Sequence, residues 1–405
     1  MSSFGSNYQV KWDALKVNSE ERKTRTIVHL STAHQALDSR IHHRECRSIS
    51  AAGYNVFLIA QHRGNETIDR VQIIGLRSMP NRLYRMTIGQ LIALRKAIKL
   101  KPDLVHFHDP ELLPLGFLLS FTRMKIVYDA HEDYVDQIMH KPWINPWGRR
   151  LISRFMAKLE PVAARRFVGT VVAPPATVER LQSSGIPNII PVQNLPRLED
   201  LPFVDSEVSN QSTSNPKRTF RLAYVGGITR VRGAIEMIEA IQLCKTDVRL
   251  TLAGDCSLEL LETLQQLEGW NKVDYLGRIR PDEVMTVLQS ADAGISILQP
   301  IKNYLEQYPT KVFEYMAAGI PFVVSNFPIM EDLVSSIGCG FLVDPFNIEE
   351  IANAVDGLSS LPDTGKLMGA KGREAAVETY NWDFEAKRLI AAYDSAFGFG
   401  SSSNQ

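Results

Sequence analysis

The sequence predicts an α/β protein with two Rossmann-like domains, each built on a doubly wound parallel sheet, that face each other across a cleft. Short β-branched apolar runs alternate with helix-length amphipathic stretches, a pattern typical of parallel sheets covered by helices on both faces. The alternation starts a second time after residues 203–219, which are rich in Ser, Asn and Pro. Ligands of such sheets bind at the carboxyl ends of the strands, so we expect the functional site in the cleft.

The domain boundaries follow from this pattern. Residues 1–25 are polar and predict a flexible N-terminal tail, and residues 26–202 predict the first domain. Residues 203–219 have the composition of an exposed linker, and residues 220–380 predict the second domain. The last amphipathic stretch, residues 381–398, predicts a C-terminal helix.

The predicted strands are separated by intervals that are too long for hairpins, which favours parallel connections. In the first domain we expect strands at Thr26–Leu30, Asn55–Gln61, Val71–Gly75, Leu104–His108, Ile126–Asp129, Thr170–Ala173 and Ile189–Val192. In the second domain we expect them at Arg221–Val225, Arg249–Ala253, Val273–Leu276, Ala293–Leu298, Phe322–Ser325 and Gly340–Val343.

The composition is that of an ordinary globular protein. Of the 405 residues, 44% are apolar and 22% are charged, which excludes a globally disordered or low-complexity chain. The 4 cysteines are scattered without metal-like spacing, and this favours a reducing cytoplasm over a disulfide framework. The most apolar run, Leu112–Phe121, is about half the length that a bilayer requires, and the start of the chain lacks the apolar core of a secretory signal.

Charge is distributed unevenly although the net charge is zero. Residues 1–200 hold 28 Lys and Arg against 18 Asp and Glu, a balance of +10. The remainder holds 17 against 27, a balance of −10. The sequence therefore predicts that the two domains have different partners, and that the first meets something anionic.

Two glutamates mark the most informative stretch, residues 303–328. Glu306 and Glu314 are separated by seven residues. With a helix starting near Thr310, Glu314 would project from its first turns and Glu306 would lie in the preceding loop, so that both could face one ligand. From spacing alone, surface capping by these carboxylates is the alternative interpretation.

The expected start of this helix is itself a candidate anion site. Pro309 is suited to a helix start. The amides of Thr310, Lys311 and Val312 would then be free donors at a positive helix end, where a diphosphate binds well. The Lys311 ammonium adds a full positive charge.

A glycine pair follows the first strand of the second domain, in the segment AYVGGITRVRG. Gly226 and Gly227 allow the backbone to approach a phosphate closely, and Arg232 could clamp it with two hydrogen bonds. A plain structural turn is the alternative.

In the first domain, polar residues gather at predicted strand ends. His106 and His108 have period-2 spacing on one strand, but no third metal ligand is evident nearby, so we favour a hydrogen-bonded core pair over a metal site. The turn STAHQALDSR after the first strand offers Asp38 and Arg40 for binding, whereas Ser31 can equally cap a helix.

These segments carry a resemblance to a known family. Residues 303–328, and PTKVFEYMAAGIP in particular, resemble the donor-site signature of retaining family 4 glycosyltransferases of the GT-B fold, in the form found in bacterial polysaccharide and O-antigen transferases. The resemblance implies that Glu306 contacts the transferred sugar and Glu314 the ribose. The usual Gly-rich loop after the first glutamate is replaced here by Gln307–Tyr308–Pro309. The closing segment YNWDFEAKRLIAAY resembles the family's last helix, which crosses back to the first domain.

The resemblance also assigns roles to other residues. Gly227 occupies the place of the family's diphosphate-binding arginine and Arg232 that of its lysine, so Lys311 is our candidate for the missing cation. The segment YLGRIR resembles the stretch that reads the nucleobase, and it places Arg278 and Ile279 near the base. His131 matches the histidine that reaches the donor sugar. The resulting catalytic candidates are His131, Glu306, Arg232 and Lys311, the donor-binding set adds Gly226, Gly227, Arg278, Ile279, Thr310, Val312 and Glu314, and the acceptor-side set is Ser31, Asp38, Arg40, Asp109 and Glu111.

The implied activity is transfer of a sugar from a nucleotide-diphosphate donor, by analogy a UDP-sugar, to a saccharide or lipid-linked acceptor with retention, in cell-surface polysaccharide synthesis. A nucleotide-sugar epimerase or inverting transferase of the same fold, or a non-catalytic binding subunit, are the alternatives. No cofactor and no catalytic metal are expected because the sequence has no DxD motif, and no nucleic-acid partner is expected. The absence of GxGxxG after either first strand disfavours a dinucleotide oxidoreductase.

Residues 140–158 combine Trp143 and Trp147 with several basic residues and no acidic one. Such a segment suits an anionic membrane surface or a lipid-diphosphate acceptor, and it predicts a cytoplasmic protein that is peripheral at the inner face of the plasma membrane. The alternative is a helix that packs its apolar face on the sheet and exposes its basic side. The apolar residues at helical spacing are Trp147, Leu151, Ile152, Phe155 and Met156, and the basic flank holds Arg149, Arg150 and Arg154.

Overall fold

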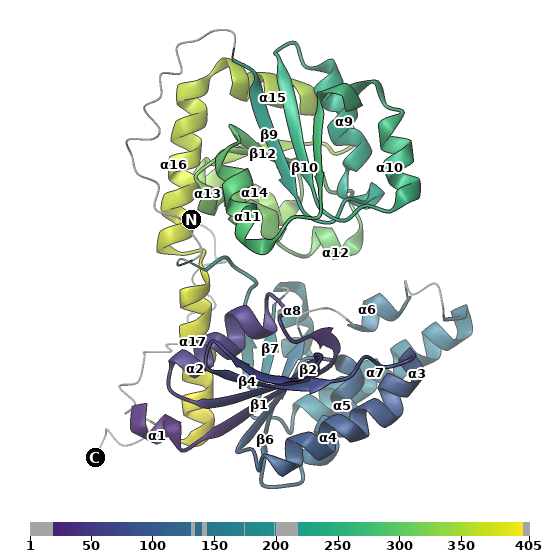
Figure 1. Ribbon diagram of the computed structural model, residues 1–405, viewed down its shortest axis with the longest axis vertical. Helices are drawn as coiled ribbons and strands as arrows, with labels where there is room; N and C mark the ends of the chain where they lie inside the picture. Colours follow the sequence, from purple (N-terminus) through teal and green to yellow (C-terminus); the bar gives the residue numbers. More distant parts are fainter. Residues whose placement is uncertain are drawn as a thin grey trace. The chain divides into compact units, whose positions relative to one another are not determined.

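The computed structural model describes residues 19–130, 134–139, 144–173, 175–197, 199 and 218–399. The chain divides into two compact units: Met1–Asn194 with Trp382–Gln405, and Leu195–Asn381. Each unit is built around one sheet (Figure 1). The division lies before the predicted linker at 203–219, of which all but the last two residues fall outside the described part of the chain.

The sheet of the first unit has the order β3-β4-β2-β1-β5-β6-β7-β8. All neighbouring strands are parallel except β3, which pairs antiparallel with β4 at the edge. The strands are β1 Thr26–Gln35, β2 Asn55–Gln61, β3 Asn65–Ile68, β4 Val71–Leu76, β5 Leu104–Phe107, β6 Lys125–Ala130, β7 Gly169–Val172 and β8 Ile189–Pro191.

Helices cover both faces of this sheet, because its central strands are apolar on both sides. Val28 and Leu30 of β1 point to one face, which packs against α4, α5, α7 and α8. Ile27 points to the other, where η1, α2 and α17 lie. The helices are α1 Ser19–Lys23, η1 Ile41–Cys46, α2 Arg47–Ala51, α3 Arg82–Tyr84, η2 Arg85–Gly89, α4 Gln90–Lys99, η3 Pro110–Leu112, α5 Leu113–Leu119, α6 Tyr134–Met139, α7 Pro146–Ala164, α8 Pro175–Ser183 and α17 Trp382–Phe397.

The C-terminal helix α17 is part of this first unit. Its Asp394 carboxylate accepts two hydrogen bonds from Arg22 in α1, at 2.9 and 2.6 Å, and one of 2.6 Å from the Tyr54 hydroxyl. Trp382 Nε1 donates to Ser48 Oγ of α2 at 2.8 Å. The prediction of a flexible tail up to residue 25 is therefore wrong for residues 19–25, since α1 is held by a partly buried ion pair.

The sheet of the second unit is parallel throughout and has the order β11-β10-β9-β12-β13-β14. Side chains of β9 alternate between two cores, with Leu222 and Tyr224 on one face and Ala223 and Val225 on the other. The strands are β9 Phe220–Val225, β10 Val248–Ala253, β11 Val273–Gly277, β12 Ala293–Ser296, β13 Phe322–Ser325 and β14 Gly340–Val343.

The helices of the second unit cover both faces of its sheet (Figure 1). Helices α9, α10 and α15 pack on one face, and α11, α13, α14 and α16 on the other. Their bounds are η6 Arg230–Arg232, α9 Ala234–Leu243, α10 Leu258–Gln265, η7 Glu268–Lys272, α11 Pro281–Gln289, α12 Lys302–Leu305, α13 Thr310–Ala318, α14 Pro328–Ile337, α15 Ile348–Ser360 and α16 Pro362–Glu378. Of the helices that the structure describes in the whole chain, none is both long and apolar enough to cross a membrane.

Candidate functional site

The carboxyl edge of the second sheet carries the predicted phosphate turn. Gly226 and Gly227 follow β9 directly and lead into η6. The turn packs tightly on its neighbours, because a Cβ added at Gly254 would lie 1.7 Å from the Gly226 carbonyl oxygen. Gly233 has a φ of 69° and a Cβ there would lie 1.8 Å from the Ile297 carbonyl oxygen, so α9 can begin there only on a glycine.

Arg232 and Lys311 both lie against this turn. The Lys311 Cε is 3.0 Å from the position of a Cβ added at Gly226, and Arg232 Nη1 is 3.2 Å from one added at Gly227. Arg232 Nε donates to the Tyr304 hydroxyl at 3.3 Å. Burial lowers the pKa of Arg232, but the hydrogen bond to Tyr304 and the charge interaction with Tyr224 outweigh it and raise that pKa, so the guanidinium stays charged.

Helix α13 begins at Thr310 after Pro309, as predicted. The Val312 amide donates to the Pro309 carbonyl at 3.1 Å, so the prediction that it is a free donor is wrong. The first turn of α13 has a tighter, 3₁₀-type hydrogen bond here, so the Val312 amide is already satisfied within the helix. The amides of Thr310 and Lys311 have no backbone acceptor within the described residues.

The two glutamates differ in their surroundings. Glu314, on the first turns of α13, accepts a hydrogen bond of 2.6 Å from Lys311 Nζ, and both side chains are about a quarter or less exposed. Glu306 is half-buried in the loop after α12, and its carboxylate has no hydrogen bond or ion pair with the other described residues. Both therefore lie where the sequence placed them, but only Glu314 is held by a partner.

The predicted nucleobase stretch follows β11. The Arg278 side chain is 81% exposed, and its Nη1 lies 4.0 Å from Asp255. Ile279 is half-buried and packs against the core around α13. A cavity of about 440 Å³ lies at the same edge of the sheet and is lined by Ile228, Thr229, Arg230, Asp255, Cys256, Ser257, Glu259 and Leu260.

In the first unit, Asp109 holds the second half of β1, which continues to Gln35 through the residues predicted as a turn and has an irregular register with β2 there. Its carboxylate accepts hydrogen bonds from the amides of Thr32 and Ala33, from the Ser31 hydroxyl and from His34 Nδ1. Burial raises the pKa of Asp109, but the His34 contacts and these amides outweigh it and lower that pKa. Asp109 and Ser31 are buried, so their geometry argues for a positioning role in place of the direct acceptor contact that the sequence predicted.

Arg40 and Asp38 also act locally. The Asp38 carboxylate accepts from the amides of Arg40 and Ile41 at 2.8 and 2.9 Å and so holds the turn that leads into η1. Arg40 is buried and contacts Asp129 at 3.2 Å and Glu45 at 3.1 Å. Here too, the buried position favours a positioning role over contact with an acceptor.

Glu111 has a partner that the sequence analysis missed. Arg85 donates to its two carboxylate oxygens at 2.8 and 3.0 Å. In the sequence, Arg85 is part of no recognisable motif and resembles any surface arginine of a helix. Only the fold shows that it contacts Glu111. It also lines a cavity of about 240 Å³ with Gln61, Ser78, Met79, Asn81 and Arg82.

The prediction that no third ligand lies near His106 and His108 is wrong. His29 of β1 and Glu45 of η1 lie beside them, and all four side chains are fully buried. The pair is also hydrogen-bonded within the core, as predicted. His131, the predicted histidine of the donor sugar, lies outside the described residues.

Helix α7 contains most of the predicted membrane segment. Trp147 is 83% exposed and Leu151 is 73% exposed, and only Met156 of the predicted apolar set is buried. The alternative that this apolar face packs on the sheet is therefore wrong for four of the five residues, whereas Met156 does pack in the core of the first unit. Arg149 donates to the carbonyls of Ile144 and Met139, at 2.6 and 3.2 Å.

The two parallel-sheet units define a protein of the GT-B fold class, and the prediction of two Rossmann-like α/β domains is confirmed. Residues 205–375 match the family model described as glycosyl transferases group 1, and residues 40–194 match the one described as glycosyltransferase family 4. Each half of the chain therefore matches a glycosyltransferase family model.

Several individual proteins are similar to this chain. An uncharacterised glycosyltransferase of Methanocaldococcus jannaschii is 28% identical over 179 residues, which cover 43% of this chain and 45% of that protein. The sulfoquinovosyl transferase of Arabidopsis thaliana is 23% identical over 366 residues, which cover 83% of this chain and 66% of that protein. The chain thus spans less than two thirds of the length of these curated relatives. Among solved structures, Anabaena HepE in complex with UDP-glucose gives a TM-score of 0.67 at 17% identity, over 92% of this chain and 99% of that one.

Proposed function

We propose that this chain transfers a sugar from a nucleotide-diphosphate donor to a saccharide or lipid-linked acceptor, with retention of the anomeric configuration. The observation that carries the proposal is the convergence of Arg232, Lys311 and the start of α13 on the Gly226–Gly227 turn. A diphosphate needs several cations and backbone donors at one place, and this edge of the sheet offers both. The UDP-glucose bound to HepE supports UDP-sugars as the donor class.

The chemistry asks the protein for charge stabilisation rather than covalent participation. Breaking the anomeric bond develops positive charge on the sugar and negative charge on the departing diphosphate. Arg232, Lys311 and the amides of Thr310 and Lys311 stabilise that negative charge, and they do so before the reaction begins. The departing phosphate oxygen takes the proton of the acceptor hydroxyl, so no metal ion or cofactor is part of the proposed reaction.

The remaining donor contacts divide between sugar and nucleoside. Glu314 fixes the ribose, Glu306 and His131 hold the transferred sugar, and Arg278 and Ile279 lie beside the base. Glu306 supports its part of this assignment because its half-buried carboxylate is not held by another described side chain and is therefore available to accept hydrogen bonds from sugar hydroxyls.

The acceptor carries phosphate in this proposal. Arg82 and Arg85 line the cavity of the first unit, and Arg85 is oriented by its paired hydrogen bonds to Glu111. Guanidinium groups bind phosphate oxygens with matched geometry. The excess of basic residues in the first 200 positions is consistent with a phosphosugar or a lipid-diphosphate sugar.

A lipid-linked acceptor would explain the surface of α7. Trp147, Leu151 and Phe155 occupy one exposed face at spacings of four residues, and Arg150 and Arg154 are exposed beside it. The neighbouring helix α5 adds exposed Leu118, and exposed Phe121 follows two residues after the end of this helix. We therefore propose peripheral binding to an anionic membrane and a role in cell-surface polysaccharide synthesis.

The test is incubation with a panel of nucleotide sugars, with and without acceptors, while released nucleoside diphosphate is measured. We expect release of UDP from one UDP-sugar, accelerated by a phosphate-bearing acceptor. An epimerase would convert the donor without accelerated release upon acceptor addition. A non-catalytic binding subunit would bind the donor and release nothing over the background, and either result would refute the proposed transfer.

A further inference from the structure

A second cluster of chemically active side chains lies inside the first unit, apart from the donor residues. His29 of β1 is paired in register with His106 of β5, so both side chains leave the sheet on one face. His108 follows two positions after His106 and leaves the chain on the same side. Glu45 reaches these rings from η1, a π-helical turn that covers this face of the sheet.

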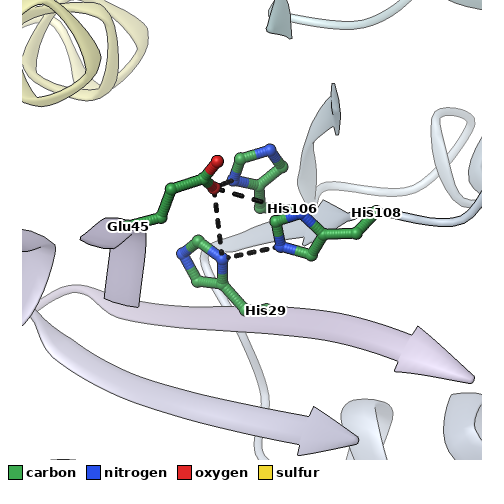
Figure 2. A group of neighbouring side chains, drawn as sticks. All are labelled: His29, Glu45, His106 and His108. Carbon is green, nitrogen blue, oxygen red and sulfur yellow. Dashed lines mark hydrogen bonds and ion pairs between the residues drawn. The ribbon is translucent and has the colours of Figure 1, made fainter. Parts of the chain in front are cut away.

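The four groups converge at short range (Figure 2). His29 Nδ1 and His108 Nε2 are 3.0 Å apart. Glu45 Oε2 lies 3.6 Å from His106 Nδ1 and 4.0 Å from Nδ1 of both His29 and His108. Each of the four side chains is fully buried.

We propose that His29, Glu45, His106 and His108 form a binding site for one divalent transition-metal ion of the zinc type. Three imidazoles and one carboxylate are a ligand set that zinc takes in tetrahedral geometry. With metal–ligand bonds of about 2.0–2.1 Å, the ligand atoms of such a site lie about 3.3 Å apart. The separations of 3.0 to 4.0 Å bracket that value, so small side-chain adjustments close the site.

The surroundings have the second layer of contacts that metal sites need. Nδ1 of His108 is hydrogen-bonded to Asp129 at 2.9 Å, an arrangement that turns Nε2 toward the cluster. Carboxylate–histidine–metal relays of this kind fix the ring and raise its basicity. The Tyr393 hydroxyl of α17 lies 3.4 Å from His29 Nε2, on the side of the ring away from Nδ1, so it braces this ring. It also lies 2.7 Å from His106 Nδ1, and an ion bound at that nitrogen would replace this hydrogen bond.

Charge and hydrogen bonding also favour a cation. Arg40 contacts two buried carboxylates, Glu45 and Asp129, at 3.1 and 3.2 Å. Two carboxylates against one guanidinium leave a negative charge in a water-excluded place. Glu45 Oε1 is paired with Arg40, whereas Glu45 Oε2 has no hydrogen-bond partner within the described residues. A divalent ion would neutralise this charge and give this buried oxygen a partner.

This site would be structural. The ion would join β1, β5 and η1. The site uses none of the residues assigned to donor binding, so its test does not depend on the proposed transferase activity. The opposing interpretation is a metal-free hydrogen-bonded cluster in which a proton neutralises Glu45.

The experiment is to unfold the full chain, remove metals, and refold it with and without excess Co²⁺, a coloured substitute for zinc. After gel filtration, we expect about one cobalt per chain, the intense visible absorption of a tetrahedral ion, and a higher Tm than for the metal-free protein. Refolded protein that holds essentially no cobalt and has an unchanged Tm would overturn the proposal.

Variants locate the ion. Glu45→Gln keeps the shape of the side chain and removes the ligand charge, so we expect at least a tenfold loss of cobalt affinity and loss of the visible bands. His43→Ala is the matched control, because it disrupts the other histidine cluster, His42, His43 and Asp69, near the surface of the same unit. Bands that survive in Glu45→Gln and disappear in His43→Ala would contradict the assignment. Should Glu45→Gln fail to fold, His43→Ala decides the matter, because bands that survive in it support the proposed site and bands that disappear in it contradict the proposal.

Discussion

Lys311 Nζ donates a hydrogen bond of 2.6 Å to Glu314 Oε2 on the first turn of α13. Lys311 lies beside Gly226 and brings Glu314 near this turn, so in the proposed site a cation and an acceptor carboxylate lie where the diphosphate and the ribose would meet. We expect incoming phosphate oxygens to compete with Glu314 for the lysine. The carboxylate would then be released to accept hydrogen bonds from the ribose hydroxyls.

Removing either cation of this turn should slow the reaction. Arg232→Ala and Lys311→Ala should each lower kcat/KM, because each removes about 2–4 kcal/mol of transition-state stabilisation, the range for a preorganised charge contact. Steady-state kinetics on folded protein measure the effect. Arg249→Ala is the control, because this arginine pairs with Asp274 near the start of β10 and should leave the rate unchanged. Rates near wild type in both site variants would refute the clamp.

The anomeric configuration of the donor should survive in the product. This expectation rests on the proposed assignment of Glu306 and Glu314 to the two glutamates of a retaining site. NMR of the newly formed linkage distinguishes the outcomes, and an inverted linkage would exclude a retaining mechanism. Brief treatment with a chelator should leave the rate unchanged, because no exchangeable metal takes part in the proposed step, and a fully buried ion would not be released in that time.

Helix α7 should bind anionic vesicles. Leu151→Asp with Phe155→Asp removes the exposed apolar face, and Arg150→Glu with Arg154→Glu reverses the charge beside it. Each double variant should lose most of the vesicle-bound fraction in sedimentation, and wild-type binding should weaken as salt rises. Leu367→Asp alters a comparably exposed leucine of the second unit and serves as the control. Wild-type protein that stays in the supernatant at low salt would show that the surface has another purpose.

The His34–Asp109 pair should make stability depend on pH. Burial lowers the pKa of His34, but the hydrogen bond and charge of Asp109 outweigh it and raise that pKa. A raised folded-state pKa stabilises the fold fully below the unfolded value of about 6.5 and loses that contribution as pH rises through the folded value. As the pH rises through the folded-state pKa, the free energy of unfolding of the wild-type protein should therefore fall by about 1 kcal/mol more than that of His34→Gln. Urea unfolding of both proteins at about pH 6 and about pH 9 checks it, and parallel pH profiles would contradict it.

Nearly all strands of the two sheets could be predicted from the sequence. The one strand that was missed shows which kind of strand the sequence does not reveal. Every predicted strand is present, because strands buried on both faces are continuous apolar runs. Strand β3, Asn65–Ile68, was missed. It has the sequence NETI, lies exposed at the sheet edge and is held by antiparallel pairing with β4, so it carries no apolar signal.

The parts of the candidate site that depend on neighbouring residues in the sequence could be predicted. Pro309 marks the start of α13, and the glycine pair marks the turn after β9. Contacts between distant segments were not predictable. Glu45 meets His29 only because η1 folds over the sheet, and Arg85 meets Glu111 only through the packing of the first unit. A helix that packs its apolar face on the core has the same amphipathic pattern as a helix that exposes this face for binding another surface. The exposure of Trp147 could therefore be known only from the structure.

The most direct test of the central claim, that the turn at Gly226 binds a diphosphate, is a calorimetric comparison of UDP with UMP. The account predicts that wild-type protein binds UDP at least about tenfold more tightly than UMP, a difference of about 1.4 kcal/mol supplied by contacts to the second phosphate. It also predicts that this preference disappears in the Arg232→Ala, Lys311→Ala double variant, and that Arg249→Ala keeps it. Equal affinities of the wild-type chain for UDP and UMP, or a preference for UDP that survives in the double variant, would contradict it.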